Sequence, residues 1–129
     1  MGIDAGTESV RAVLYDLGGR QVAQASRSNL TTFPRPGWAE QSPAGWIKNL
    51  TESVHECLSQ VEDFSPDQVK GLCVDGTCST VVAALNDGTV LGDAILWMDT
   101  RAADEARHIA ASNHPVLRYS GGEDAVEWL

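Results

Sequence analysis

Residues 2–16 read GIDAGTESVRAVLYD, and this stretch sets the expectation for the fold. Two apolar runs with the alternation of β-strands flank a short turn. The turn is polar and contains Asp4, Gly6, Thr7, Glu8 and Ser9. Residues 9–17 alternate well enough for a strand, and the glycines of Asp16–Gly19 favour a hairpin into a second strand over 20–28. The chain is therefore expected to open with a three-strand meander.

A helix is predicted to follow an irregular segment. Prolines and a glycine disfavour regular structure over residues 31–43, and Ser42 with Pro43 forms a helix N-cap and first position. From Trp46, apolar residues recur every three to four positions, so an amphipathic helix is expected to about Glu62.

The second half of the chain alternates short strands with one more helix. The pattern predicts strands over 69–74 and 80–85, a turn at Asn86–Gly88, a short apolar run over 94–97, and a helix over 101–111. Thr100 is the expected cap of that helix, and Ala106, Ile109 and Ala110 are its expected core residues. The fold class is therefore α/β. Nothing in the sequence marks a domain boundary, and both ends look as if they lie inside a larger fold.

Composition excludes several classes of function. The 129 residues carry a net charge of −9 and no cluster of Lys and Arg, so a phosphate backbone would be repelled and nucleic-acid binding is not expected. No apolar stretch is long enough to span a bilayer and no export signal is visible, so we expect no membrane association and a cytoplasmic location. The three cysteines and three histidines lack the spacing of a metal site.

The turn after Ile3 can hold phosphate. If strands end at Asp4 and begin at Val10, the backbone amides of residues 6–8 are exposed together with nearby hydroxyls, and Gly6 lets the backbone approach a ligand closely. Asp4 would repel a phosphate unless a cation lay between them, and magnesium fits that place. The alternative is an ordinary hairpin turn in which Asp4 and Thr7 make only local hydrogen bonds.

Four segments together resemble the FGGY carbohydrate kinases, whose domains have the ribonuclease-H-like, actin-like ATPase fold. These segments are GIDAGTESVRA (2–12), GWAEQSPAGW (37–46), VDGTCSTVV (74–82) and ILWMDTRA (95–102), in family order over almost the whole chain. Asp75–Ser79, Trp97–Ala102 and the ending YSGGEDAVEWL (119–129) look most like the ribulokinase and ribitol-kinase-like branch. The chain would then be the N-terminal part of the first domain of such a kinase.

The resemblance implies nucleotide-site roles at the first turn. Asp4 would organise magnesium, while Thr7, Ser9 and Arg11 would contact the phosphates of ATP. Gly6 and Glu8 would contribute backbone amides, with the Glu8 side chain turned away.

The resemblance also implies a sugar side. Asp75, Gly76, Thr77 and Cys78 would pass the sugar, with Trp97 as an apolar wall and Asp99 and Arg101 as hydroxyl partners. Each has a plainer alternative: core packing for Trp97 and Cys78, and a surface ion pair for Asp99 and Arg101. Similarly, Trp38 could staple a loop, Glu40 could be a solvated acid, and Glu127 could be a surface acid on a helix.

The expected reaction is transfer of the γ-phosphate of ATP to a hydroxyl of a pentulose or pentitol, with ribulose or ribitol as first candidates. In the family the catalytic base lies beyond residue 129, so no catalytic residue is assigned and the 129 residues alone are expected to be inactive. A homodimer of the full-length protein is a further candidate. The alternatives are a non-catalytic actin-like binding module and an ATPase of the same superfamily that acts on no sugar.

Overall fold

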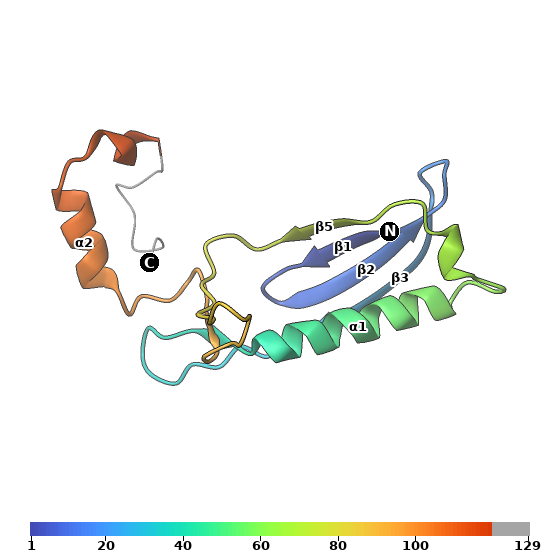
Figure 1. Ribbon diagram of the computed structural model, residues 1–129, viewed down its shortest axis with the longest axis horizontal. Helices are drawn as coiled ribbons and strands as arrows, with labels where there is room; N and C mark the ends of the chain where they lie inside the picture. Colours follow the sequence, from blue (N-terminus) through green and yellow to red (C-terminus); the bar gives the residue numbers. More distant parts are fainter. Residues whose placement is uncertain (120–129) are drawn as a thin grey trace. The chain divides into compact units, whose positions relative to one another are not determined.

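The computed structural model describes residues 1–119, which form two compact units (Figure 1). The first unit joins Met1–Leu30 to Ser42–Thr77, and the second joins Thr31–Gln41 to the described residues from Cys78 onward. Each unit therefore combines segments that are not adjacent in the sequence. The chain passes between the units three times, after Leu30, Gln41 and Thr77.

The first unit contains a four-stranded sheet in the order β3-β2-β1-β5. Strands β1 (Gly2–Ala5), β2 (Ser9–Tyr15) and β3 (Gln21–Ser28) are antiparallel neighbours, which confirms the predicted meander. Strand β5 (Cys73–Gly76) runs parallel to β1 at the sheet edge. The apolar pattern predicted that this strand would start at residue 69. It starts at Cys73, because Gly2 and Cys73 are the first residues of β1 and β5 to pair.

The hairpin between β2 and β3 is the one that the sequence predicted. Asp16 Oδ1 accepts hydrogen bonds of 2.9 Å from the amides of Gly18 and Arg20, and Gly19 donates to the Asp16 carbonyl at 3.0 Å. Gly19 has a φ of +83°, a conformation that L side chains rarely adopt.

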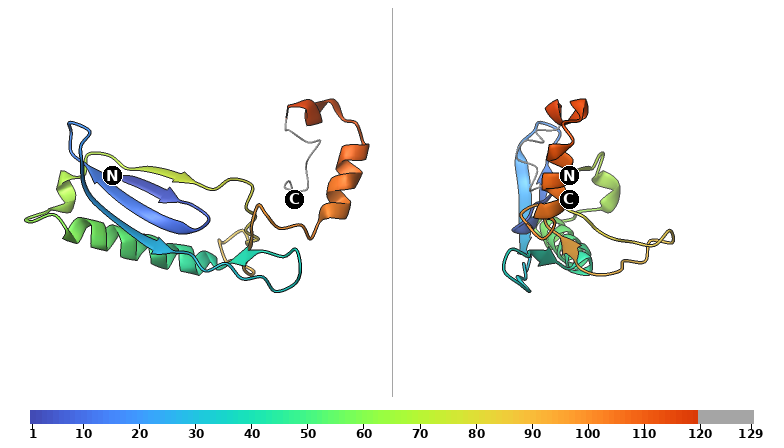
Figure 2. Two further views of the ribbon diagram at one scale, coloured as in Figure 1. Left: turned by 180° about the vertical axis from the view of Figure 1, so that it is seen from behind. Right: turned by 90° about the vertical axis from the view of Figure 1, so that its left-hand side faces the viewer.

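Helix α1 (Pro43–Ser59) packs along β2 and β3 and covers one face of the sheet (Figures 1 and 2). It begins at the predicted cap, because Ser42 Oγ accepts from the Gly45 amide at 3.4 Å. The fully buried Ser53 hydroxyl donates to the Val10 carbonyl at 3.1 Å and ties the helix to β2. The core between helix and sheet consists of Ile3, Val10, Ala12, Leu14, Ala23, Ala25 and Cys57. A short 3-10 helix, Pro66–Gln68, leads back to the sheet.

The second unit is built on a two-stranded ladder that sequence analysis missed. Strand β4 (Glu40–Gln41) pairs antiparallel with β6 (Ala94–Ile95), so the segment 31–43 is not wholly irregular. The predicted strand over 80–85 was wrong, because only the isolated bridges Val81–Ile95 and Ala84–Val90 form there. The predicted turn before Val90 is present, with the Gly88 amide donating to the Leu85 carbonyl at 2.9 Å.

Helix α2 (Ala103–Ala111) confirms the second predicted helix but not its cap. Ala102 occupies the N-cap position without a side-chain hydrogen bond, whereas the Thr100 hydroxyl donates to the Gly37 carbonyl at 3.2 Å. Ala106 is buried as expected, but Ile109 is 48% exposed. A 3-10 helix, Pro115–Arg118, follows. Within the described residues, no helix combines the length and apolar character needed to cross a membrane. Glu127 and residues 120–129 of the predicted ending lie outside the described residues.

Candidate functional site

The turn that joins β1 to β2 is anchored on its carbonyl side by Asn29. The Asn29 side-chain amide donates to the Gly6 carbonyl at 2.9 Å and lies 3.5 Å from the Thr7 carbonyl. The Asn29 backbone amide donates to the Glu8 carbonyl at 2.8 Å. Asn49 in turn donates to Asn29 Oδ1 at 2.8 Å, which fixes the orientation of the anchoring amide.

This anchoring decides where the amides of the turn point. A trans peptide unit carries its C=O and N–H on opposite sides. Because the carbonyls of Gly6 and Thr7 are directed toward Asn29, the amides of Thr7 and Glu8 are directed away from it. The Glu8 side chain is exposed. An added Cβ at Gly6 would lie 3.3 Å from Asp4 Oδ1, so any larger residue at this position would crowd the Asp4 carboxylate.

Asp4, Arg11 and Asp75 form a row across three adjacent strands. They are register partners in the β1–β2 and β1–β5 pairs, and directly paired residues share a face of a sheet. The face is the one opposite α1, since Val10 and Ala12 point toward the core. Ser9 lies on the Arg11 side of β2, two residues earlier. A shallow hollow of about 460 Å³ on this face includes Asp4 and Arg11 in its lining.

An ion pair orients the Asp4 carboxylate. Arg11 Nη1 donates to Asp4 Oδ2 at 2.9 Å, while Oδ1 is the oxygen that lies on the Gly6 side. Both side chains are about half exposed, 50% for Asp4 and 47% for Arg11, so the pair contributes little to stability. Its consequence is geometric, because one carboxylate oxygen is held and the other faces the turn.

These residues fit a magnesium–phosphate group. Magnesium keeps several waters and usually takes one or two carboxylates together with phosphate oxygens. Asp4 Oδ1 supplies a carboxylate oxygen on the Gly6 side of the turn, and the amides of Thr7 and Glu8 are donors suited to phosphate oxygens. Among residues 1–119, no three His, Cys, Asp or Glu side chains are grouped as an all-protein metal site. The roles of Gly6, Thr7, Glu8, Ser9, Arg11 and Asp4 toward ATP and magnesium stay predictions.

The end of β5 meets the end of β1. The Thr77 amide donates to the Ala5 carbonyl at 3.2 Å, and the hydroxyls of Thr7 and Thr77 lie 3.4 Å apart. A residue expected at the phosphates and one expected at the sugar are therefore adjacent at one end of the sheet. Asp75 Oδ1 accepts from the Gly76 amide at 2.9 Å, which shapes the approach to Thr77.

Cys78 begins the second of the two segments that form the second unit, and it is exposed. The interpretation of Cys78 as a small packed residue was therefore wrong, because its side chain is exposed. Cys57, by contrast, is fully buried in the first core, and burial raises the pKa of its thiol. Whether Cys78 contacts a sugar stays a prediction.

In the second unit, the GWAEQ and WMDTRA segments meet. Arg101 Nη2 donates to Glu40 Oε1 and to Asp99 Oδ2, both at 2.7 Å, and the guanidinium lies 3.8 Å from the centroid of the Trp38 ring. Asp99 is only 4% exposed, whereas Trp97 is 38% exposed. Asp99 is thus buried and Arg101 is partly buried, with a side chain 20% exposed, so they are not the surface pair considered from the sequence.

The charges of this pair are stabilised by each other. Burial acts to raise the pKa of Asp99, but hydrogen bonds from the Arg101 side chain and the Ala39 amide outweigh it, so the pKa lies below the usual 3.8. Hydrogen bonding to Asp99, and then to Glu40, raises the pKa of Arg101. Both groups therefore remain charged at neutral pH.

Sequence reasoning missed three contributors. Asn29 was not singled out because its contacts are to carbonyls that are adjacent only after the meander folds. Trp38 and Glu40 have the sequence pattern of loop residues, because their partner Arg101 lies about sixty residues away. The one indication of the contact between Trp38, Glu40 and Arg101 is that residues 37–46 and 95–102 both resemble segments of the same family.

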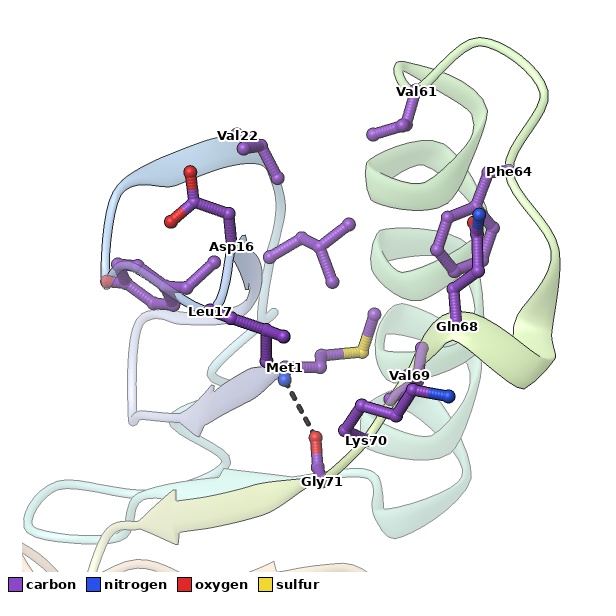
Figure 3. A pocket seen from close by; sticks show the side chains of 12 residues that line it. Met1, Asp16, Leu17, Val22, Val61, Phe64, Gln68, Val69, Lys70 and Gly71 are labelled. Atoms are coloured by element: carbon purple, nitrogen blue, oxygen red, sulfur yellow. Dashed lines mark hydrogen bonds between the residues drawn. The ribbon is translucent and has the colours of Figure 1, made fainter.

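A separate apolar pocket lies at the other end of β1, beside Met1 (Figure 3). It encloses about 340 Å³ between the end of β2, the end of α1 and the segment that enters β5. The Met1 amine donates to the Gly71 carbonyl at 2.8 Å at its base. Its lining residues include Leu14, Leu17, Val61, Phe64 and Val69. None of the candidate site residues lies in it.

Comparison with known proteins identifies the family. The model of the "FGGY family of carbohydrate kinases, N-terminal domain" matches residues 1–121. The chain belongs to the FGGY family of carbohydrate kinases. The expected fold class is confirmed, because the similar solved structures are FGGY kinases, which have the actin-like ATPase fold, and the chain forms part of the N-terminal domain.

The relatives are sugar and polyol kinases. An FGGY carbohydrate kinase domain-containing protein of Xenopus laevis is 37% identical over 98% of this chain and 24% of its own length. Glycerol kinase of Corynebacterium glutamicum is 34% identical over 98% of this chain and 23% of its own. The crystal structure of xylulose kinase from Rhodospirillum rubrum is 37% identical, with a TM-score of 0.78, over 86% of this chain and 22% of that one. The chain spans about a quarter of the length of these FGGY relatives.

Proposed function

We propose that the protein carrying this chain is an ATP-dependent kinase that transfers the γ-phosphate to a hydroxyl of a pentulose or pentitol. The proposal rests on one observation above the others. The Thr7 and Thr77 hydroxyls lie 3.4 Å apart at the end of β1 and β5. Phosphoryl transfer needs its two reactants held side by side, and this end of the sheet offers a phosphate-binding turn next to a candidate sugar segment.

The chain's own residues have positioning roles in this proposal. The outward amides of the first turn and the Arg11 guanidinium hold phosphate oxygens, and the Asp4 carboxylate, oriented by Arg11, faces the metal position. When bound, magnesium neutralises phosphate charge that the acid would otherwise repel. In the first unit, Thr77 is the residue expected to border the acceptor. For Cys78 and Trp97, in the second unit, contact with the acceptor is what the family resemblance implies, with the Trp97 ring as a flat apolar face for the carbon skeleton.

The residue that takes the proton from the attacking hydroxyl is expected beyond residue 129. The 129 residues alone are therefore expected to be inactive, and the activity belongs to the full-length protein. A cytoplasmic location and a homodimer remain predictions.

The acceptor is the finer part of the proposal. Similarity of Asp75–Ser79 and Trp97–Ala102 to the ribulokinase and ribitol-kinase-like branch makes ribulose and ribitol the first candidates. The names of the relatives add glycerol and xylulose to the panel, and xylulose is itself a pentulose.

The experiment is a measurement of ADP release by the full-length protein with magnesium and ATP. Each of ribulose, ribitol, xylulose and glycerol is supplied in turn, with a no-acceptor control. We expect release that depends on a pentulose or pentitol and is lost when magnesium is chelated. Release that is the same without acceptor would favour an ATPase that acts on no sugar, and glycerol as the sole acceptor would refute the pentulose class.

A further inference from the structure

A tight turn carries Trp97 and Met98 at its tip. The Asp99 amide donates to the Leu96 carbonyl at 2.9 Å and closes the turn. Leu96 and Asp99 are buried, at 2% and 4% exposed, whereas Trp97 and Met98 are 38% and 37% exposed. Two buried anchors thus present two large side chains at the surface of the second unit.

Both anchors are held by one buried residue, Ala39. The Leu96 amide donates to the Ala39 carbonyl at 3.0 Å, and the Ala39 amide donates to Asp99 Oδ2 at 2.7 Å. These bonds continue the line of the β4–β6 ladder, in which Glu40 pairs with Ile95. The Asp99 carboxylate therefore takes the place that a strand carbonyl would occupy, and it lets the chain turn outward while remaining attached.

The Asp99 carboxylate has no capacity left for a ligand. Its two oxygens accept four hydrogen bonds: from the Ala39 amide, from the Arg101 amide, and from Nε and Nη2 of Arg101. Four is about the full acceptor capacity of a carboxylate. The side chain is also only 2% exposed.

Arg101 is fixed from three directions. It binds Asp99 through a two-pronged contact, with Nε at 2.9 Å from Oδ1 and Nη2 at 2.7 Å from Oδ2. It also donates to Glu40 Oε1 at 2.7 Å and stacks on the Trp38 ring. Since the Arg101 side chain is 20% exposed, its guanidinium serves chiefly to hold Asp99 in one orientation.

We propose that Asp99 is a positioning residue: held by Arg101 and the Ala39 amide, it fixes the turn that presents Trp97 to the carbohydrate and does not itself contact the carbohydrate. This role differs from the hydroxyl contact that the family resemblance implied for Asp99. It rests on the proposed function, in which Trp97 forms the apolar wall of the acceptor site.

A double-mutant cycle in the full-length protein separates positioning from contact. Asp99→Asn is expected to raise the KM for the accepted carbohydrate about tenfold, the range of coupled neighbours, and to leave the KM for ATP unchanged. In a Trp97→Ala background the same change is expected to have little further effect, because the turn then has no aromatic face to position. A direct contact by Asp99 would instead give effects that multiply, and this result would overturn the proposal.

Fluorine NMR tests whether Asp99 fixes the position of Trp97, and it needs no enzymatic activity. The full-length protein is labelled with 5-fluorotryptophan, and the ¹⁹F resonance of Trp97 is identified by its loss in Trp97→Phe. We expect Asp99→Asn to shift or broaden the Trp97 resonance. The matched control is Asp104→Asn, which breaks the exposed pair with Arg107 in α2, and it should leave that resonance unchanged. A Trp97 resonance that is the same in both variants would refute positioning.

A second variant guards against failure of Asp99→Asn to fold. Arg101→Lys keeps the positive charge but cannot make the two-pronged contact, so it should change the Trp97 resonance and the carbohydrate KM in the same direction. Turnover and the ¹⁹F spectrum test different claims, so one can fail without the other. If the wild-type protein shows no carbohydrate-dependent turnover, the proposed function fails, whereas the fluorine spectra still decide whether Asp99 positions Trp97.

Discussion

Replacement of Asn29 by alanine should loosen the candidate phosphate turn. The Asn29 side chain donates hydrogen bonds to two carbonyls of this turn, at 2.9 Å to Gly6 and 3.5 Å to Thr7, and it also accepts from Asn49 at 2.8 Å. Asn29→Ala removes these bonds but keeps the backbone bond to the Glu8 carbonyl.

The magnitude follows from the bonds that are lost. Two well-formed hydrogen bonds, each with a net contribution of about 0.5–1.5 kcal/mol, give a destabilisation of about 1–3 kcal/mol. For a unit of this size, each kcal/mol lowers Tm by roughly 4–8 °C. A nucleotide must then also order the loosened turn, so its affinity in the full-length protein should fall roughly tenfold, the equivalent of about 1.4 kcal/mol.

The assay is thermal unfolding followed by circular dichroism, together with calorimetric titration of the full-length protein with magnesium–ADP. The matched control is Gln21→Ala, which removes an exposed side-chain bond to Gln24 on β3 of the same unit. That control should stay within about 0.5 kcal/mol of wild type. Equal Tm values and equal nucleotide affinities for the two variants would show that Asn29 does not support the turn.

Three further perturbations test other parts of the structure. Gly37→Ala should destabilise the second unit by about 1–3 kcal/mol in chemical denaturation, because φ is +81° there and the new Cβ would lie 2.5 Å from Thr100 Oγ1; an unchanged denaturation midpoint would contradict this. Burial acts to raise the pKa of Asp99, but hydrogen bonds from Arg101 and the backbone lower it below its usual value of 3.8. Below about pH 4 the unfolded chain therefore binds more protons at this carboxylate than the folded chain does. The stability that the Asp99 carboxylate contributes is lost as the pH falls through this range. The difference in unfolding free energy between wild type and Asp99→Asn should therefore be constant near neutral pH and shrink below pH 3.8, and a difference that does not change with acid would refute the assignment. Asp4→Asn should change stability by less than about 1 kcal/mol, since its ion pair is exposed, yet remove the magnesium dependence of nucleotide binding in the full-length protein; magnesium dependence equal to wild type would show that the carboxylate only shapes the turn.

The sequence predicted the parts of the fold that depend on local patterns. Strand alternation over Ser9–Tyr15, the Asp16–Gly19 hairpin and the Ser42 cap each involve neighbours within a few residues, and all three are present. The predictions of a strand over 80–85 and of a helix cap at Thr100 were wrong because both depend on residues that are distant in the sequence. Their backbone partners, such as Gly37 for Thr100, are set by the tertiary fold.

The candidate site shows the same limit. Residue types near the first turn indicated a phosphate ligand, but the direction of its amides depends on Asn29, which reaches the turn only when β3 pairs with β2. The Asp99–Arg101 contact is local, yet its link to Ala39 and Glu40 joins segments about sixty residues apart. A single sequence does not encode such pairings in any short-range pattern.

Hydrogen–deuterium exchange of the full-length protein tests most directly whether the first turn holds nucleotide phosphates. Amides that donate to phosphate oxygens exchange slowly. We therefore expect peptides that cover residues 6–9 to gain protection with saturating magnesium–ADP or a non-hydrolysable ATP analogue, and not with magnesium alone. Peptides over the Asp16–Gly19 hairpin serve as the internal control. Unchanged exchange at residues 6–9, with nucleotide binding verified by calorimetry, would contradict the account.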